Sequence, residues 1–289
     1  MTACKGGAGD AVKLIPDSAT MVAGVDIKGV MGSKIYASIK DKVEEGGKDG
    51  IESAKKCNLG PDTWKSVVVG ADTAKGDDAM VAIITADGAG KKENLDCVAK
   101  EMKAANGDKD AMTFEEDGKV IKLEGDDHVG YVINDNTIAF AGKDWAASVK
   151  ELRDGKGKNA MDGSLKELVD RTDTGKHIWF AGTIPSEVGG MAAGPLGFTP
   201  KDASGWLDLS SGLALQAAVG GADDAGKVAE TLQTTYDGMK GMATKQGLPQ
   251  GAADSVKIGD KGGAVTVEAS MSDDDVKAMM DKAGPMLPF

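Results

Sequence analysis

Residues 64–102 read WKSVVVGADTAKGDDAMVAIITADGAGKKENLDCVAKEM, and this stretch decides the fold. Its two short apolar runs, at 67–69 and 81–84, are typical of strands, and the glycines and aspartates between them supply turn chemistry. Apolar residues then recur from Leu95 to Met102 at the spacing of one helix face. The stretch therefore predicts a strand–turn–strand–turn–helix unit.

The rest of the chain repeats this plan. A shorter copy of the unit runs from 206 to 232, and the strand predicted at 20–24 aligns with residues 178–182. Between the two copies lies 154–159, a linker rich in glycine and lysine. We predict an α+β fold of two divergent repeats, each an antiparallel β-sheet with helices packed on one face. The expected domains are a flexible N-terminal lipid-anchor tether at 1–17, a first repeat at 18–153 and a second repeat at 164–289.

Composition narrows the function classes. Hydrophobic residues make up 41% and charged residues 28% of the chain, which is enough apolar material for a core. The net charge is −12, and Arg153 and Arg171 are the only arginines. Such a surface repels nucleic acid and offers little bidentate recognition of phosphate, so we expect no nucleic-acid partner. No apolar run approaches the length of about 18 residues that predicts a transmembrane helix.

The N-terminal residues Met1-Thr2-Ala3-Cys4 resemble the end of a bacterial lipobox, in which the cysteine after small residues is acylated. We therefore expect a lipid on Cys4, followed by a tether at 5–10. The charged and apolar regions of a secretion signal are missing, so either the chain was trimmed or its start was assigned too late. The alternative is a chance cysteine near a disordered N-terminus.

Cys57 and Cys97 are predicted to form a disulfide. Cys97 lies one residue off the apolar face of its helix, beside Lys100 and Glu101, where a free thiol has no packing role. A bond to Cys57 stabilises the fold by about 4 kcal/mol on the chain-entropy model, and it implies an oxidising compartment. The alternative is two unpaired cysteines in a cytosolic protein.

Motifs with known chemistry are incomplete. Residues 221–228 nearly fit a phosphate-binding loop, but Val228 stands where serine or threonine holds magnesium, so we expect no nucleotide. Neither His128 nor His177 has a partner at metal-ligand spacing, and we expect no metal or other cofactor. The pattern Ser-x-x-Lys at 53–56 is short enough to arise by chance. We assign no catalytic residue.

The segment 189–198 is apolar, rich in glycine and uncharged. It either covers the core or forms a mobile apolar binding loop that presents Met191, Leu196 and Phe198 to a partner or a lipid. Core packing is the favoured interpretation.

Three segments carry a resemblance to a known group: MVAGVD at 21–26, CNLGP at 57–61 and WKSVVVG at 64–70. With the lipobox-like start, the chain resembles the uncharacterised envelope lipoproteins of myxobacteria and their relatives, most clearly over 14–100. The resemblance implies an envelope location and a duplicated α+β fold, and no reaction. Lys5 after the lipidated cysteine resembles an outer-membrane sorting signal, so we expect anchoring there, facing the periplasm or the exterior.

These observations favour a non-enzymatic bacterial envelope lipoprotein that binds a protein partner or an apolar ligand. The alternatives are a periplasmic or secreted hydrolase with a carboxylate-based site, and a lipid carrier. A deep pocket holding two convergent carboxylates indicates the hydrolase, and a cavity lined by methionine and valine indicates the carrier.

Overall fold

A computed structural model describes residues 8–107 and 109–283. The chain divides into two compact units, each described separately below. The first unit comprises Met1–Lys28 and Val43–Lys166, and the second comprises Gly29–Lys42 and Glu167–Phe289. Each unit combines an antiparallel sheet with helices, so the predicted α+β class is confirmed.

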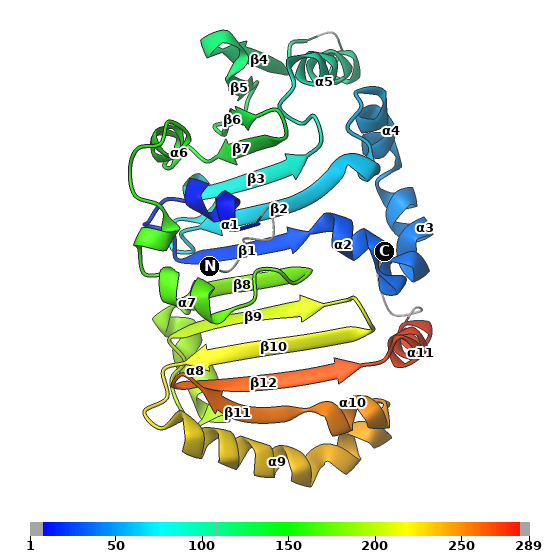
Figure 1. Cartoon of the computed structure of the whole chain (residues 1–289), viewed down its shortest axis with the longest axis vertical. Coiled ribbons are helices and arrows are strands. Elements are labelled where there is room, and N and C mark those ends of the chain that lie inside the picture. The colour runs from blue at the N-terminus through cyan, green and yellow to red at the C-terminus, as the bar shows by residue number, and fades with distance from the viewer. Residues whose placement is uncertain (1–7, 108, 284–289) are drawn as a thin grey trace, which may run out of the picture. The chain divides into compact units, whose positions relative to one another are not determined.

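The strands of the first unit lie side by side in the order β1-β2-β3-β7-β6-β5-β4 (Figure 1). Their bounds are β1 Met21–Asp26, β2 Trp64–Ala71, β3 Met80–Ala86, β4 Met112–Glu115, β5 Val120–Leu123, β6 Val129–Asn134 and β7 Thr137–Ala141. The predicted hairpin is β2 and β3, with Val68 opposite Ile83 and both side chains buried.

From β1 to just beyond β7 the chain forms α2 Ile27–Gly32, α3 Lys34–Gly46, α4 Lys48–Lys56, α5 Lys92–Ala105 and α6 Ala146–Arg153. The helix face predicted from Leu95 to Met102 lies within α5. Gly47 separates α3 from α4. A tight turn joins β6 and β7, where Asn136 N donates to Asn134 Oδ1.

Helices cover both faces of the first sheet. Tyr131 points to one face, where its hydroxyl donates to Ala146 O of α6 at 2.7 Å. Ile121 points to the other face, where it is buried with Leu95 of α5 and Met112. The expectation of helices on one face is therefore wrong for this unit. The physical reason is that β2 and β3 are apolar on both sides, and an antiparallel sheet can leave a face to water only if that face is polar.

The segment before β1 is packed rather than flexible. It forms α1 Ala8–Ala11 and the 3-10 turn η1 Val12–Leu14, and the next residue, Ile15, is fully buried. A Cβ built on Gly70 would lie 2.3 Å from Ile15 Cγ2, so glycine is required beneath this segment. The predicted tether is therefore wrong for residues 8–17, because their apolar side chains fill the core.

The predicted linker also contacts the N-terminal segment. Pro16 pairs with Asn159 in an isolated bridge, and Ala160 N donates to Ile15 O at 2.7 Å. Ala160 opens the 3-10 turn η5 Ala160–Asp162, which Asn159 caps with its side chain. The glycine-rich segment is thus a connection anchored at its end to the first unit.

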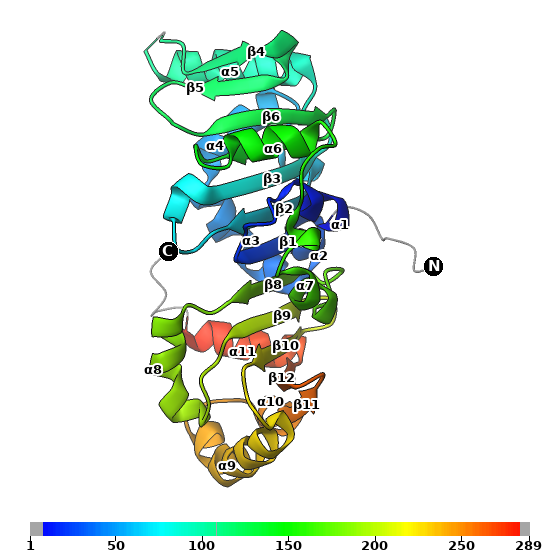
Figure 2. The ribbon, with the colours of Figure 1, turned by 90° about the vertical axis from the view of Figure 1, so that its left-hand side faces the viewer.

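In the second unit the strands follow the order β8-β9-β10-β12-β11. Their bounds are β8 Ile178–Thr183, β9 Asp202–Asp208, β10 Leu213–Gly220, β11 Lys257–Lys261 and β12 Ala264–Met271. The helices after the first unit are α7 Lys166–Arg171, α8 Ser186–Leu196, α9 Ala225–Lys245, α10 Gln250–Ser255 and α11 Asp273–Ala283. Residues 29–42, which form most of α2 and α3, also belong to this second unit. Figure 2 shows α8 at the outer left of this unit, away from α7.

One core cluster of the second unit lies between α9 and the strands β11 and β12. Ala225 and Ala229 of α9 are buried against Val265 of β12. Small side chains on the helix allow it to approach the sheet closely, which fits a chain with 4% aromatic residues. In each unit the first three strands of the chain lie next to one another in the sheet, in the order of the sequence. The last strand of the unit then pairs with the third.

Candidate functional site

The strongest candidate site lies between α4 and α5 of the first unit. The predicted disulfide is present: Cys57 follows the last residue of α4, Cys97 lies within α5, and their Cα atoms are 5.5 Å apart. Cys57 is 1% exposed and Cys97 is half-buried, and their bond links the end of α4 to α5. The prediction of this disulfide is confirmed.

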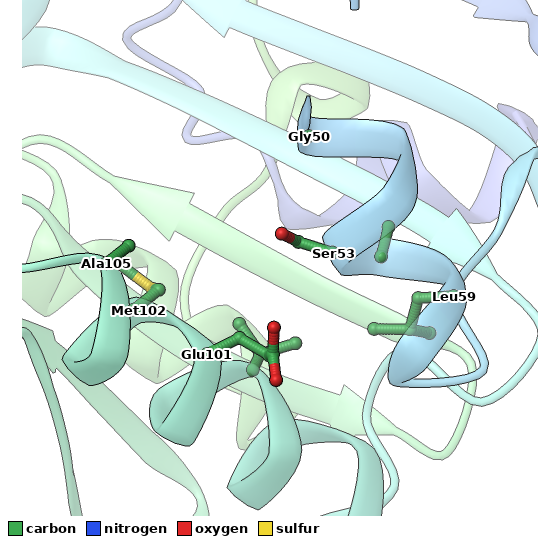
Figure 3. A pocket seen from close by; sticks show the side chains of 8 residues that line it. Gly50, Ser53, Leu59, Glu101, Met102 and Ala105 are labelled. Atoms are coloured by element: carbon green, nitrogen blue, oxygen red, sulfur yellow. The ribbon is translucent and has the colours of Figure 1, made fainter. Parts of the chain in front are cut away.

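Between the two helices lies a pocket of about 260 Å³. Five of its lining side chains are apolar, and two carry oxygen (Figure 3). The lining residues are Gly50, Ser53, Ala54, Leu59, Val98, Glu101, Met102 and Ala105. Leu59 is held in place by its backbone, because Trp64 Nε1 donates to Leu59 O at 2.8 Å.

The polar groups of the pocket come from both helices. Figure 3 shows Ser53 pointing from α4 toward α5, and Glu101 extending from α5 toward α4. Glu101 Oε2 accepts a hydrogen bond from Lys56 Nζ at 2.7 Å, and the Lys56 side chain is 62% exposed. Glu101 Oε1 receives no hydrogen bond from any residue within 8–107 or 109–283.

The same geometry decides how to interpret the Ser-x-x-Lys pattern. The hydrogen bond and the charge of Glu101 raise the pKa of Lys56. A protonated lysine cannot act as the base that activates a serine, so the ion pair with Glu101 disfavours that role for Lys56.

The pocket could be predicted only in part. Its α5 wall, Val98 and Met102, belongs to the helix face that the sequence assigned to the core, and both residues also pack against that core. Glu101 and Leu59 were missed as pocket residues. The only signal in the sequence was the cysteine pair, which predicted that α4 and α5 lie close together.

The candidate binding loop at 189–198 is not a loop. Residues 186–196 form α8, which ends at Gly197 in the left-handed conformation, with φ 75°. Met191 is 84% exposed, whereas Phe198 packs against the α9 core cluster with Leu232. The structure therefore separates the predicted residues: Phe198 belongs to the core, and Met191 lies on the surface of a helix.

The remaining candidate residues have structural roles or lie outside the described residues. Asp224 accepts a hydrogen bond from Lys227 N at 3.0 Å, so the phosphate-loop-like segment is the capped start of α9. His128 contacts Asp126, and His177 contacts Asp208. Among the described residues, no group of three histidines, cysteines or acidic residues could hold a metal ion. Cys4 lies outside the described residues.

An ion-pair cluster in the second unit was missed by the sequence analysis. Lys176 Nζ donates to Asp208 Oδ2 at 2.6 Å and lies 4.9 Å from the centre of the Trp206 ring. Ser210 N donates to Asp208 Oδ1, and Leu209 N donates to His177 Nδ1. The hydrogen bond from Lys176 keeps the pKa of Asp208 well below its usual value. The cluster fixes the β9–β10 turn onto the residues before β8.

No known protein family and no curated protein matches the sequence. Solved structures that share its fold include two crystal forms of TP0453. Crystal form III of TP0453 has a TM-score of 0.54 at 9% sequence identity, and the match covers 94% of this chain and 97% of that chain. Crystal form I of TP0453 has a TM-score of 0.52 at 9% identity, with 94% and 96% covered. Within the described part of this chain, no helix has the length and apolar character needed to span a bilayer. At this identity the likeness to TP0453 is one of fold.

Proposed function

We propose that this chain is a non-enzymatic lipoprotein of the bacterial cell envelope that binds a protein partner or an apolar ligand. A lipid on Cys4 anchors it to the outer membrane. The observation that carries the binding function is the apolar pocket between α4 and α5, two helices that the Cys57–Cys97 disulfide links. The disulfide also supports the location, because such bonds persist in oxidising compartments.

The volume of the pocket distinguishes between the candidate ligands. Pockets that bind drug-sized ligands have volumes of about 300–1,000 Å³, whereas this pocket has about 260 Å³. It therefore suits one side chain or a short alkyl chain, and it is too small to hold a whole membrane lipid. The lipid-carrier alternative gains no support from this pocket.

The proposal includes kinship with the envelope lipoproteins of myxobacteria and an internal duplication of the fold. The duplication is supported by the matching strand orders, in which β7 pairs with β3 and β12 pairs with β10. The kinship rests on the segments at 21–26, 57–61 and 64–70.

The binding function is tested with 1-hexanol as the probe. We expect saturable NMR shifts at the methyl groups of Leu59, Val98 and Met102, because these side chains line the pocket. Ala105→Leu fills the pocket and should weaken binding at least tenfold. Ala104→Leu is the matched control, since Ala104 is the exposed neighbour on α5 outside the lining and should leave binding unchanged. Non-saturable shifts, or equal binding by both variants, would refute the pocket as the binding site.

A further inference from the structure

We propose that the α4–α5 pocket is the socket for a lysine side chain of a protein partner. This inference rests on the proposed function and deepens it, because it chooses the protein partner over the apolar ligand. The lysine stem would lie along the apolar wall of the pocket, and its ammonium group would bind Glu101.

The pocket offers both parts of this recognition. Val98, Met102 and Leu59 supply apolar surface, which lysine stems cover readily while the charged head stays at a polar rim. Glu101 supplies the carboxylate, and its Oε1 receives no hydrogen bond within the described segments of the chain. Ser53 adds a hydroxyl that can accept a further hydrogen bond from an ammonium.

Lys56 does not block the site. Its side chain is 62% exposed, and an ion pair so open to water contributes only about 0–1 kcal/mol. A partner ammonium can therefore share Glu101 or displace Lys56 at small cost. Lys56 nevertheless competes for the same carboxylate, so its replacement should change the affinity for a partner lysine.

The charge of the whole chain also favours a basic protein partner. The net charge of −12 favours the approach of basic proteins over acidic ones. The charges on α4 and α5 themselves nearly balance, so Glu101 supplies the local attraction for an ammonium group. The volume of about 260 Å³ admits one long side chain.

The experiment compares blocked amino acids by NMR titration of the full oxidised chain. The probes are Nα-acetyl-lysine N-methylamide and its norleucine counterpart, which has the same stem without the ammonium. We expect the lysine probe to bind three- to tenfold more tightly than the norleucine probe. Glu101→Gln should reduce that ratio to about one, and Lys56→Met should raise affinity for the lysine probe. Glu93→Gln is the matched control, because Glu93 lies in the first turn of the same helix, outside the pocket.

Each result decides between proposals. Equal binding of the two probes, or a ratio that Glu101→Gln leaves unchanged, would overturn the lysine inference while 1-hexanol binding still supports an apolar pocket. If n-pentylammonium binds more than tenfold tighter than the blocked lysine, the occupant is a free amine and the inference of a partner side chain is wrong. Absence of saturable binding by every probe, 1-hexanol included, would refute both proposals.

Discussion

Asp208 shows how single side chains hold the second unit together. It accepts hydrogen bonds from Lys176 and from Ser210 N, and its side chain is 17% exposed. A carboxylate that is bonded in this way is more acidic in the folded chain than in the unfolded chain. Folding stability is therefore coupled to its ionisation.

Asp208→Asn should lower the free energy of unfolding at pH 7 by about 1–2 kcal/mol, because it removes the charge that Lys176 binds. Since the folded pKa is depressed, the contribution is complete above the ordinary aspartate pKa of about 3.9 and is lost as the pH falls below it. Urea unfolding of both proteins at pH 7 and pH 3 measures this, and the gap should shrink at pH 3. Asp41→Asn, an exposed change on α3, is the control and should have no effect at either pH. A gap that is equal at both pH values would contradict the account.

Residue patterns predicted the hairpin of β2 and β3 but not the elements that pack against it. The valines at 67–69 alternate between two covered faces, and no local signal says which helix covers each face. Gly70 was expected to serve a turn, yet it lies inside β2 because Ile15 occupies the place of its side chain. Such a requirement arises from residues distant in sequence.

At the level of elements, α8 marks the limit of sequence prediction. Three glycines and Pro195 disfavour a helix by intrinsic propensity, which is why the segment was expected to be a loop. The helix forms because Gly189 lets its backbone approach Pro200 O, where a Cβ would lie 2.6 Å away. Tertiary packing overrides local propensity here.

The pair α4 and α5 illustrates the opposite case. α4 contains no buried residue, so packing alone gives it little hold on the first unit. The cysteines predicted its position because a disulfide fixes the distance between two Cα atoms regardless of what lies between them. Glu101 could not be predicted as a pocket residue, because α4 and α5 come together only in the folded chain.

Replacing both Cys57 and Cys97 with serine should lower the free energy of unfolding by about 3–4 kcal/mol, because the unfolded chain regains the entropy of the open loop. Urea unfolding of the variant and of the oxidised wild type measures the difference. Treatment of the native, oxidised protein with a thiol-labelling reagent serves as the companion control and should leave both cysteines unmodified. A loss below about 1 kcal/mol would show that the bond adds little to the fold.

At the scale of the whole molecule, the fold class follows from composition and periodicity. The chain has apolar runs of strand length, amphipathic helices between them and few aromatics, and the α+β architecture satisfies all three. For the N-terminal segment, composition gave a wrong prediction. A glycine-rich start predicted a tether through residue 17, but Val12 and Ile15 are buried in the first unit.

The central claim is that this chain is a lipid-anchored envelope protein, and mass spectrometry of its N-terminal peptide tests it most directly. The protein is made in its native cell from the full-length gene and purified from the membrane fraction. We predict that the mature peptide begins at Cys4 and carries the mass of the attached acyl groups, because Cys4 follows small residues as a lipobox requires. An intact Met1, or an unmodified Cys4 in protein made with its complete leader, would contradict the claim.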